Sequence, residues 1–175
     1  MNIRGKNMNI LQYLLKPEIA VVFDVDGVLA PYEFGYLSHS MSDEEWDEMV
    51  SNGINPYSAI SYSPKMRRFI SHKDIKKVYV CSKCTAAEES GKREFVQEKY
   101  GILPENIYFV REQEDKIAVL KHIKEIENVS DQEVAIVEDT VKTLDRIRKS
   151  GNYITVHISS FIDREWLREK NNGRY

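Results

Sequence analysis

Five short runs of apolar residues recur along the chain, and most of them are continuous rather than alternating. They are rich in β-branched and aromatic residues, which are typical of strands. Continuous apolar runs indicate strands that are covered on both faces, as in a parallel sheet. The runs cover residues 19–23, 77–81, 107–110, 133–137 and 153–156. We therefore expect a five-stranded, mostly parallel sheet.

Segments with apolar residues at helical spacing lie between the later runs. They predict helices over residues 87–100, 115–126 and 140–149, and Gly101 is expected to end the first of these. Alternation of strand and helix predicts βαβ units with right-handed crossovers. The expected fold class is therefore α/β with a doubly wound sheet, in a single domain that spans residues 1–175.

The connection between the first two runs is far longer than a crossover requires. It includes an acidic helix predicted over residues 42–50, where Ser42 and Glu45 form a capping box. A further predicted helix over residues 64–71 leads into the second strand. We expect residues 31–63 to form a small helical, cap-like insertion over the rim of the sheet.

Composition and charge exclude several classes of protein. The chain has 42% hydrophobic and 30% charged residues, which are values of a globular protein, and its net charge is −3. Without a basic stripe, a nucleic-acid polymer is not an expected partner. No apolar run approaches the ~18 residues of a membrane span, so no membrane partner is expected. Two cysteines do not make a disulfide framework, and we expect a cytoplasmic protein.

Polar side chains follow four of the predicted strands. They are Asp24 and Asp26 after the first strand, Ser82 after the second, Lys116 at the start of the helix after the third, and Glu138 and Asp139 after the fourth. In doubly wound sheets, ligands bind beyond the carboxyl ends of the strands. Carboxylates gathered there repel one another unless a cation is present, and oxygen ligands favour Mg²⁺ over zinc.

These residue types suit phosphoryl transfer to a carboxylate. A carboxylate such as Asp24 can attack a phosphoryl group and hold it as an acyl phosphate. A metal ion and a lysine ammonium neutralise the phosphate charge. The acid two residues further along, Asp26, can protonate the leaving oxygen, and Gly27 lets the backbone turn tightly so that both acids face the site.

The Asp-Val-Asp-Gly-Val-Leu run that begins at Asp24, directly after an apolar strand, resembles the first motif of the haloacid dehalogenase superfamily, phosphatase branch. The resemblance extends over residues 19–156 and implies a Rossmann-like fold and a Mg²⁺-dependent phosphomonoester hydrolase. It also implies that Asp24 is the nucleophile and that Asp26 is the general acid and base. The backbone carbonyl of Asp26 would bind the metal as well.

The later motifs of the same superfamily resemble three other positions. The resemblance implies that Ser82 and Lys116 bind the phosphate. It implies that Asp139 is the firmer metal ligand and that Glu138 is a direct or water-mediated one. Asp26 separates the phosphatases from the dehalogenases proper, so cleavage of a carbon–halogen bond is not expected.

The substrate class follows only in outline. We expect a small-molecule phosphate ester. Tyr32, Phe34 and Tyr36 of the insertion lie close in sequence to Asp24 and favour a nucleotide, because aromatic rings stack on bases.

Each motif also has a structural interpretation. Asp26 and Gly27 could form only a turn, Ser82 could cap the next helix, and Lys116 could be solvated. Glu138 and Asp139 could merely favour the start of the helix that follows them. A non-catalytic phosphate-binding protein of the same fold therefore stays open as an alternative.

A second alternative comes from Cys81 and Cys84, which form a Cys-x-x-Cys pair between a strand and a helix. This is the setting of a redox dithiol. In the structural interpretation Cys81 is a small buried residue that ends a strand. A dithiol redox protein that uses Cys81 and Cys84 is therefore the other open function.

Overall fold

The computed structural model describes residues 9–31 and 42–162, and within them it forms an α/β fold. The five strands form one parallel sheet in the order β3-β2-β1-β4-β5, which confirms the predicted fold class. The strands are β1 (Ala20–Phe23), β2 (Val78–Lys83), β3 (Ile107–Val110), β4 (Val134–Glu138) and β5 (Ile154–His157).

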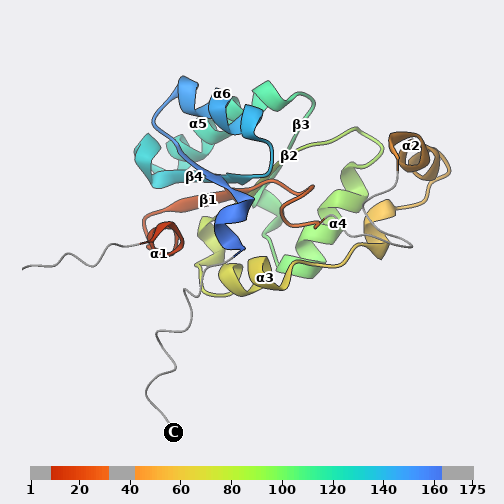
Figure 1. Ribbon diagram of the computed structural model, residues 1–175, viewed down its shortest axis with the longest axis horizontal. Helices are drawn as coiled ribbons and strands as arrows, with labels where there is room; N and C mark the ends of the chain where they lie inside the picture. Colours follow the sequence, from red (N-terminus) through yellow and green to blue (C-terminus); the bar gives the residue numbers. More distant parts are fainter. Residues whose placement is uncertain (1–8, 32–41, 163–175) are drawn as a thin grey trace, which may run out of the picture.

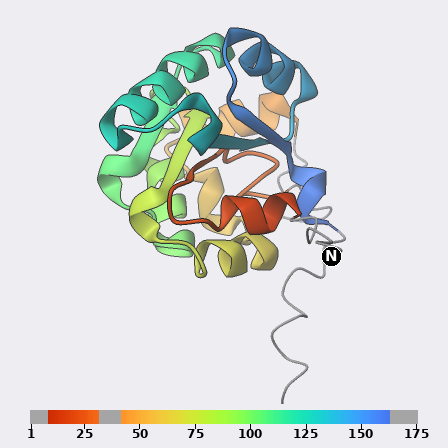
Figure 2. The ribbon, with the colours of Figure 1, turned by 90° about the vertical axis from the view of Figure 1, so that its left-hand side faces the viewer.

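Helices cover both faces of the sheet, as Figures 1 and 2 show. The α-helices are α1 (Ile10–Leu14), α2 (Asp43–Ser51), α3 (Pro64–Ile70), α4 (Glu89–Tyr100), α5 (Lys116–Glu127) and α6 (Val141–Ser150). Helices α1, α3 and α4 lie on one face, and α5 and α6 lie on the other. No helix in the two described ranges is both long and apolar enough to cross a membrane.

The continuous apolar strands divide their side chains between two cores. Val21 and Phe23 of β1 belong to the core on the side of α1, α3 and α4. Ala20 and Val22 belong to the core on the side of α5 and α6. Successive side chains of a strand point to opposite faces, so a strand buried on both faces needs an apolar residue at every position.

The strand register brings the carboxyl ends of the strands to one edge. Phe23 pairs with Val80 of β2 and with Val137 of β4, so the residues that follow β1 and β4 are neighbours. Two predicted boundaries shift here. Strand β2 runs two residues beyond its predicted end and includes Ser82, and β4 includes Glu138.

In the insertion, residues 42–63 are described and contain α2 and the 3-10 helix η1 (Pro56–Ala59). The predicted capping box of Ser42 and Glu45 is confirmed. Helix η1 packs closely on α4. The side chain of Asn55, which precedes η1, lies so near Gly91 of α4 that a Cβ at Gly91 would collide with it. This contact places the insertion at the carboxyl edge of the sheet, where α2 is seen in Figure 1.

Candidate active site

Three carboxylates converge at the carboxyl edge. One oxygen from each of Asp24, Glu138 and Asp139 lies within 4.8 Å of the others. Asp24 directly follows β1, and Glu138 and Asp139 end and follow the neighbouring strand β4. Asp24 and Glu138 are buried and Asp139 is half-buried. The structure therefore brings together three of the four acids that the sequence predicted at this edge, and Asp26 is not among them.

Lys116 lies between two of these carboxylates. Its Nζ is 3.2 Å from Asp24 Oδ2 and 2.7 Å from Glu138 Oε2, and its side chain has no exposed area. Burial alone would lower the pKa of Lys116, but the charges of Asp24 and Glu138 outweigh it and raise the pKa. The structural interpretation of Lys116 as a solvated lysine is therefore wrong.

Negative charge in this cluster exceeds what Lys116 compensates. Burial, followed by the charge of Asp24, raises the pKa of Glu138. Oδ1 of Asp24 is buried and accepts no hydrogen bond from the residues in 9–31 and 42–162, which is costly for an acceptor removed from water. Carboxylate oxygens are the ligands that a hard divalent cation such as Mg²⁺ prefers, and Asp24 Oδ1 has no hydrogen-bond donor among the described residues to compete with it.

A tight turn at Gly27 comes directly after Asp26. Gly27 has a φ of 73°, a left-handed conformation that favours glycine, and its N–H donates to the carbonyl of Ala30 at 2.9 Å. The turn that the sequence predicted at Gly27 is therefore present. It supports the placement of Asp26 at the rim rather than in the core.

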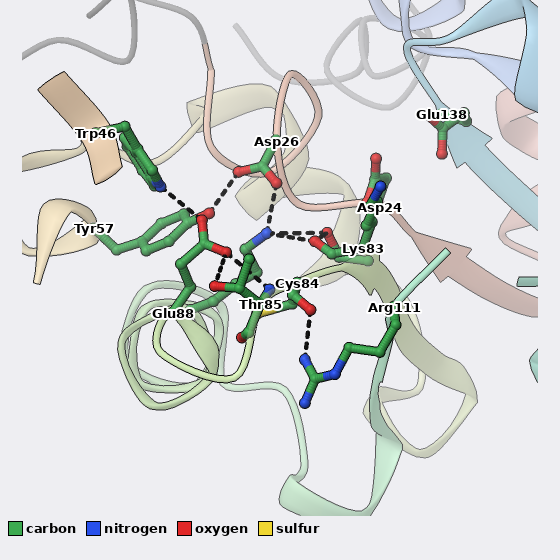
Figure 3. A network of polar contacts seen from close by, with 12 residues as sticks. Asp24, Asp26, Trp46, Tyr57, Lys83, Cys84, Thr85, Glu88, Arg111 and Glu138 are labelled. Atoms are coloured by element: carbon green, nitrogen blue, oxygen red, sulfur yellow. Dashed lines mark hydrogen bonds and ion pairs between the residues drawn. The ribbon is translucent and has the colours of Figure 1, made fainter. Parts of the chain in front are cut away.

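The side chain of Asp26 is not part of the three-carboxylate cluster. Tyr57 donates its hydroxyl to Asp26 Oδ1 at 2.8 Å, and Lys92 Nζ lies 2.6 Å from Oδ2. Figure 3 shows Asp26 turned toward Tyr57, with Asp24 and Glu138 on the other side of the view. The acid assigned to proton transfer is thus held by residues of the insertion and of α4.

Ser82 and Lys92 share the space beside this contact. Ser82 is buried, and Lys92 Nζ lies 3.5 Å from its Oγ and donates to the carbonyl of Lys83 at 2.8 Å. The structural interpretation of Ser82 as a helix cap is wrong, because α4 begins at Glu89 with Glu88 as its N-cap residue. The hydroxyl of Ser82 instead donates to the carbonyl of Lys83 at 3.4 Å.

Sequence reasoning missed Lys92, although the sequence contained a signal for it. Lys92 lies four residues before Val96 and eight before Tyr100, on the apolar side of the predicted helix. In the structure its side chain is only 2% exposed. A lysine on the buried face of a helix needs a charged partner, and here that partner is Asp26.

Tyr57 was missed as well, because nothing in its local sequence distinguishes it. Its ring packs against Trp46, with the ring centroids 5.1 Å apart, and against Phe95 at 5.8 Å. Trp46 is therefore a packing residue of the insertion. Burial, followed by the charge of Asp26, raises the pKa of Tyr57, so its hydroxyl stays protonated and donates.

The Glu138 and Asp139 pair also contacts the start of α6. Thr140 N–H donates to Glu138 Oε1 at 3.3 Å, and the Thr140 hydroxyl donates to Asp139 Oδ1 at 3.1 Å. His157 at the end of β5 lies with Nε2 at 2.9 Å from the backbone oxygen of Asp139. Helix α6 has Thr140 as its N-cap residue and no side-chain cap hydrogen bond, so the structure does not support the capping interpretation. His157 is a further residue that fixes this segment.

The two cysteines are free and buried. Burial raises the pKa of Cys81 to about 12 and that of Cys84 to about 11. A redox dithiol needs a thiol with a lowered pKa. The structure therefore does not support the dithiol alternative, and the buried-residue interpretation of Cys81 is the better one.

The aromatic residues Tyr32, Phe34 and Tyr36, which the sequence placed near the substrate, lie outside the described residues.

No family model matches the sequence, and no curated protein matches it. A crystal structure of a hypothetical protein from Xanthomonas campestris is 12% identical, with a TM-score of 0.45, over 95% of this chain and 77% of that chain. A similarity at this level carries no information about function.

Proposed function

We propose that the protein is a Mg²⁺-dependent phosphomonoester hydrolase of the haloacid dehalogenase superfamily, with Asp24 as the phosphoryl carrier. The observation that supports it most is the convergence of Asp24, Glu138 and Asp139 at the carboxyl edge, with Lys116 paired to the first two. A phosphate that entered there would meet a carboxylate nucleophile and a buried ammonium at once. Few structural roles require two buried acids and a half-buried one beside a buried lysine.

In the first step, a carboxylate oxygen of Asp24 forms a bond to phosphorus and the bond from phosphorus to the ester oxygen breaks. Asp26 gives its proton to the leaving oxygen. In the second step a water molecule attacks the aspartyl phosphate and gives a proton to Asp26. Inorganic phosphate leaves, and the carboxylate of Asp24 is restored.

The remaining residues bind and orient the phosphate. Lys116 and the hydroxyl of Ser82 would hold its oxygens. Asp24, Asp139 and Glu138, with the backbone carbonyl of Asp26, would hold Mg²⁺, which supplies neutralisation of the phosphate charge. Burial strengthens each of these interactions relative to water. We further propose a small phosphate ester as substrate, a nucleotide among the candidates, and a cytoplasmic location.

The test is the substitution Asp24→Asn, assayed with 4-nitrophenyl phosphate and Mg²⁺. We expect kcat to fall on the order of 10³-fold or more, because the amide cannot form the phosphoryl intermediate. The control is Glu127→Gln at the opposite end of the sheet. In the wild-type protein, rapid acid quenching should trap a phosphoryl group on Asp24, detectable by peptide mass spectrometry.

Two results would contradict the proposal. Undiminished turnover by Asp24→Asn would exclude Asp24 as the carrier. Binding of inorganic phosphate without turnover of a broad set of phosphate esters would favour the non-catalytic alternative.

A further inference from the structure

A carboxylate beside the proposed reaction centre is held at both oxygens by two different elements. Tyr57 of η1 donates to Asp26 Oδ1 at 2.8 Å, and Lys92 of α4 contacts Oδ2 at 2.6 Å. Tyr57 and Lys92 are each 2% exposed, whereas the side chain of Asp26 is 27% exposed. Two buried donors thus present a carboxylate at the open rim of the sheet.

Tyr57 is itself fixed by contacts that connect the insertion to α4. Its ring lies between Trp46 of α2 and Phe95 of α4. Trp46 donates its indole N–H to Glu88 at 2.6 Å, and Glu88 also accepts from the backbone of Thr85. Figure 3 shows Trp46, Tyr57 and Glu88 grouped on one side of Asp26. The position of the Tyr57 hydroxyl therefore depends on how the insertion packs on α4.

The close contact between η1 and α4 restricts how the two elements can move relative to each other. The side chain of Asn55 occupies the space that a Cβ at Gly91 would take. Asn55 also accepts from the N–H of Tyr57 at 3.0 Å and donates to Glu94 at 3.3 Å. The same residue that closes the contact between the elements thus fixes the backbone of Tyr57.

We propose that Tyr57 and Lys92 are positioning residues for Asp26, and that Tyr57 makes proton transfer depend on the packing of the insertion. This inference rests on the proposed phosphatase function. A proton donor must come within about 2.6–3.2 Å of the leaving oxygen. A partly exposed aspartate directly before a glycine turn would sample several rotamers, and contacts at both carboxylate oxygens restrict it to one.

The dependence on the leaving group separates positioning from simple structural support. An aryl phosphate with a stable leaving anion needs little proton transfer in its first step, whereas an alkyl phosphate needs it strongly. Loss of Asp26 positioning should therefore lower kcat/KM for an alkyl ester more than for an aryl ester. A general loss of folded protein lowers both values equally.

The experiment compares Tyr57→Phe and Lys92→Met with Tyr79→Phe and Lys77→Met, using glycerol phosphate and 4-nitrophenyl phosphate with Mg²⁺. We expect each of the first pair to lower kcat/KM about 10-fold or more for glycerol phosphate and less than about 3-fold for 4-nitrophenyl phosphate. Tyr79 and Lys77 hold Glu127 in the same manner, away from the site. Their variants should leave the ratio of the two kcat/KM values unchanged.

A double-mutant cycle completes the test. If Tyr57 acts through Asp26, then Tyr57→Phe in an Asp26→Asn background should lower kcat/KM no further. Equal losses on both esters, or additive losses in the cycle, would overturn the positioning role and leave the phosphatase proposal intact. A wild-type protein that turns over neither ester would overturn both. Should Lys92→Met fail to fold, Tyr57→Phe, which keeps the packed ring, decides the outcome.

Discussion

The two ends of the sheet each hold a carboxylate with a tyrosine hydroxyl and a lysine ammonium. At the carboxyl end, Tyr57 and Lys92 contact the two oxygens of Asp26. At the amino end, Tyr79 and Lys77 contact the two oxygens of Glu127, which is the last residue of α5. The two clusters therefore have the same donors, the same type of acceptor and the same charges.

The two clusters differ in whether the lysine or the carboxylate is the more exposed partner. At the carboxyl end the lysine is 2% exposed and the carboxylate is 27% exposed. At the amino end the lysine is 25% exposed and the carboxylate is 13% exposed. The amino-end cluster closes a helix end against the start of β2, with its lysine facing outward. The carboxyl-end cluster presents its carboxylate outward instead, next to the buried group of Asp24, Glu138 and Lys116.

Position in the fold thus separates two clusters that composition does not. An acid that only stabilises the fold is best covered by its partners, whereas an acid that meets a substrate has to stay accessible. The comparison leads to tests in which the same substitution is made at both ends of the sheet.

The largest difference is expected for the lysines that neutralise buried acids. In metal-free buffer, Lys116→Met should lower the free energy of unfolding by about 3–5 kcal/mol, because it leaves buried carboxylates unpaired. Lys77→Met should cost about 1 kcal/mol or less, because its pair is partly solvated. Urea denaturation followed by circular dichroism measures both values. If Lys116→Met lowered the free energy of unfolding as little as Lys77→Met does, the acids that Lys116 contacts would not be charged in the folded protein.

The sequence was sufficient to predict the sheet and the acids at its edge. A strand buried on both faces is apolar along most of its length, so the apolar runs stop at Phe23 and Val137, although β4 itself extends to Glu138. The strand-end rule then places those acids together without knowledge of any side-chain contact. Lys116 followed from its place at the start of a helix, although its burial between two carboxylates did not.

Lys92 and Tyr57 could not be predicted in the same way. Lys92 reaches Asp26 from α4, so this contact depends on the rotation of that helix over the sheet. Tyr57 lies 31 residues from Asp26, and its reach depends on the close contact of Asn55 with Gly91. Such contacts arise from tertiary packing, to which local sequence patterns are insensitive.

An intermediate effect is expected for metal binding, which should occur at one end of the sheet only. At a Mg²⁺ concentration of 100 times Kd, the folded state should gain about 2.7 kcal/mol. Thermal unfolding with Mg²⁺, and again after addition of EDTA, measures this gain without any assay of turnover. Glu127→Gln should retain the shift and Asp139→Asn should lose most of it. A shift of equal size in Asp139→Asn would place the cation elsewhere.

The smallest effect is expected where the two clusters are most alike. Tyr57 and Tyr79 are 2% and 3% exposed, and each donates its hydroxyl to a carboxylate. Replacing either with phenylalanine removes one hydrogen bond to a charged acceptor and keeps the ring, so each should cost about 1–2 kcal/mol of unfolding free energy.

Chemical denaturation of the two variants side by side tests this equality. A loss for Tyr57→Phe several times larger than for Tyr79→Phe would mean that the insertion itself depends on the hydroxyl, and its effect on turnover would then have a structural origin. With equal losses, a change in leaving-group dependence that occurs only in Tyr57→Phe can come only from the location of its carboxylate partner. The two tyrosines donate the same hydrogen bond to a carboxylate. The effect on turnover would then depend on the edge of the sheet at which that carboxylate lies.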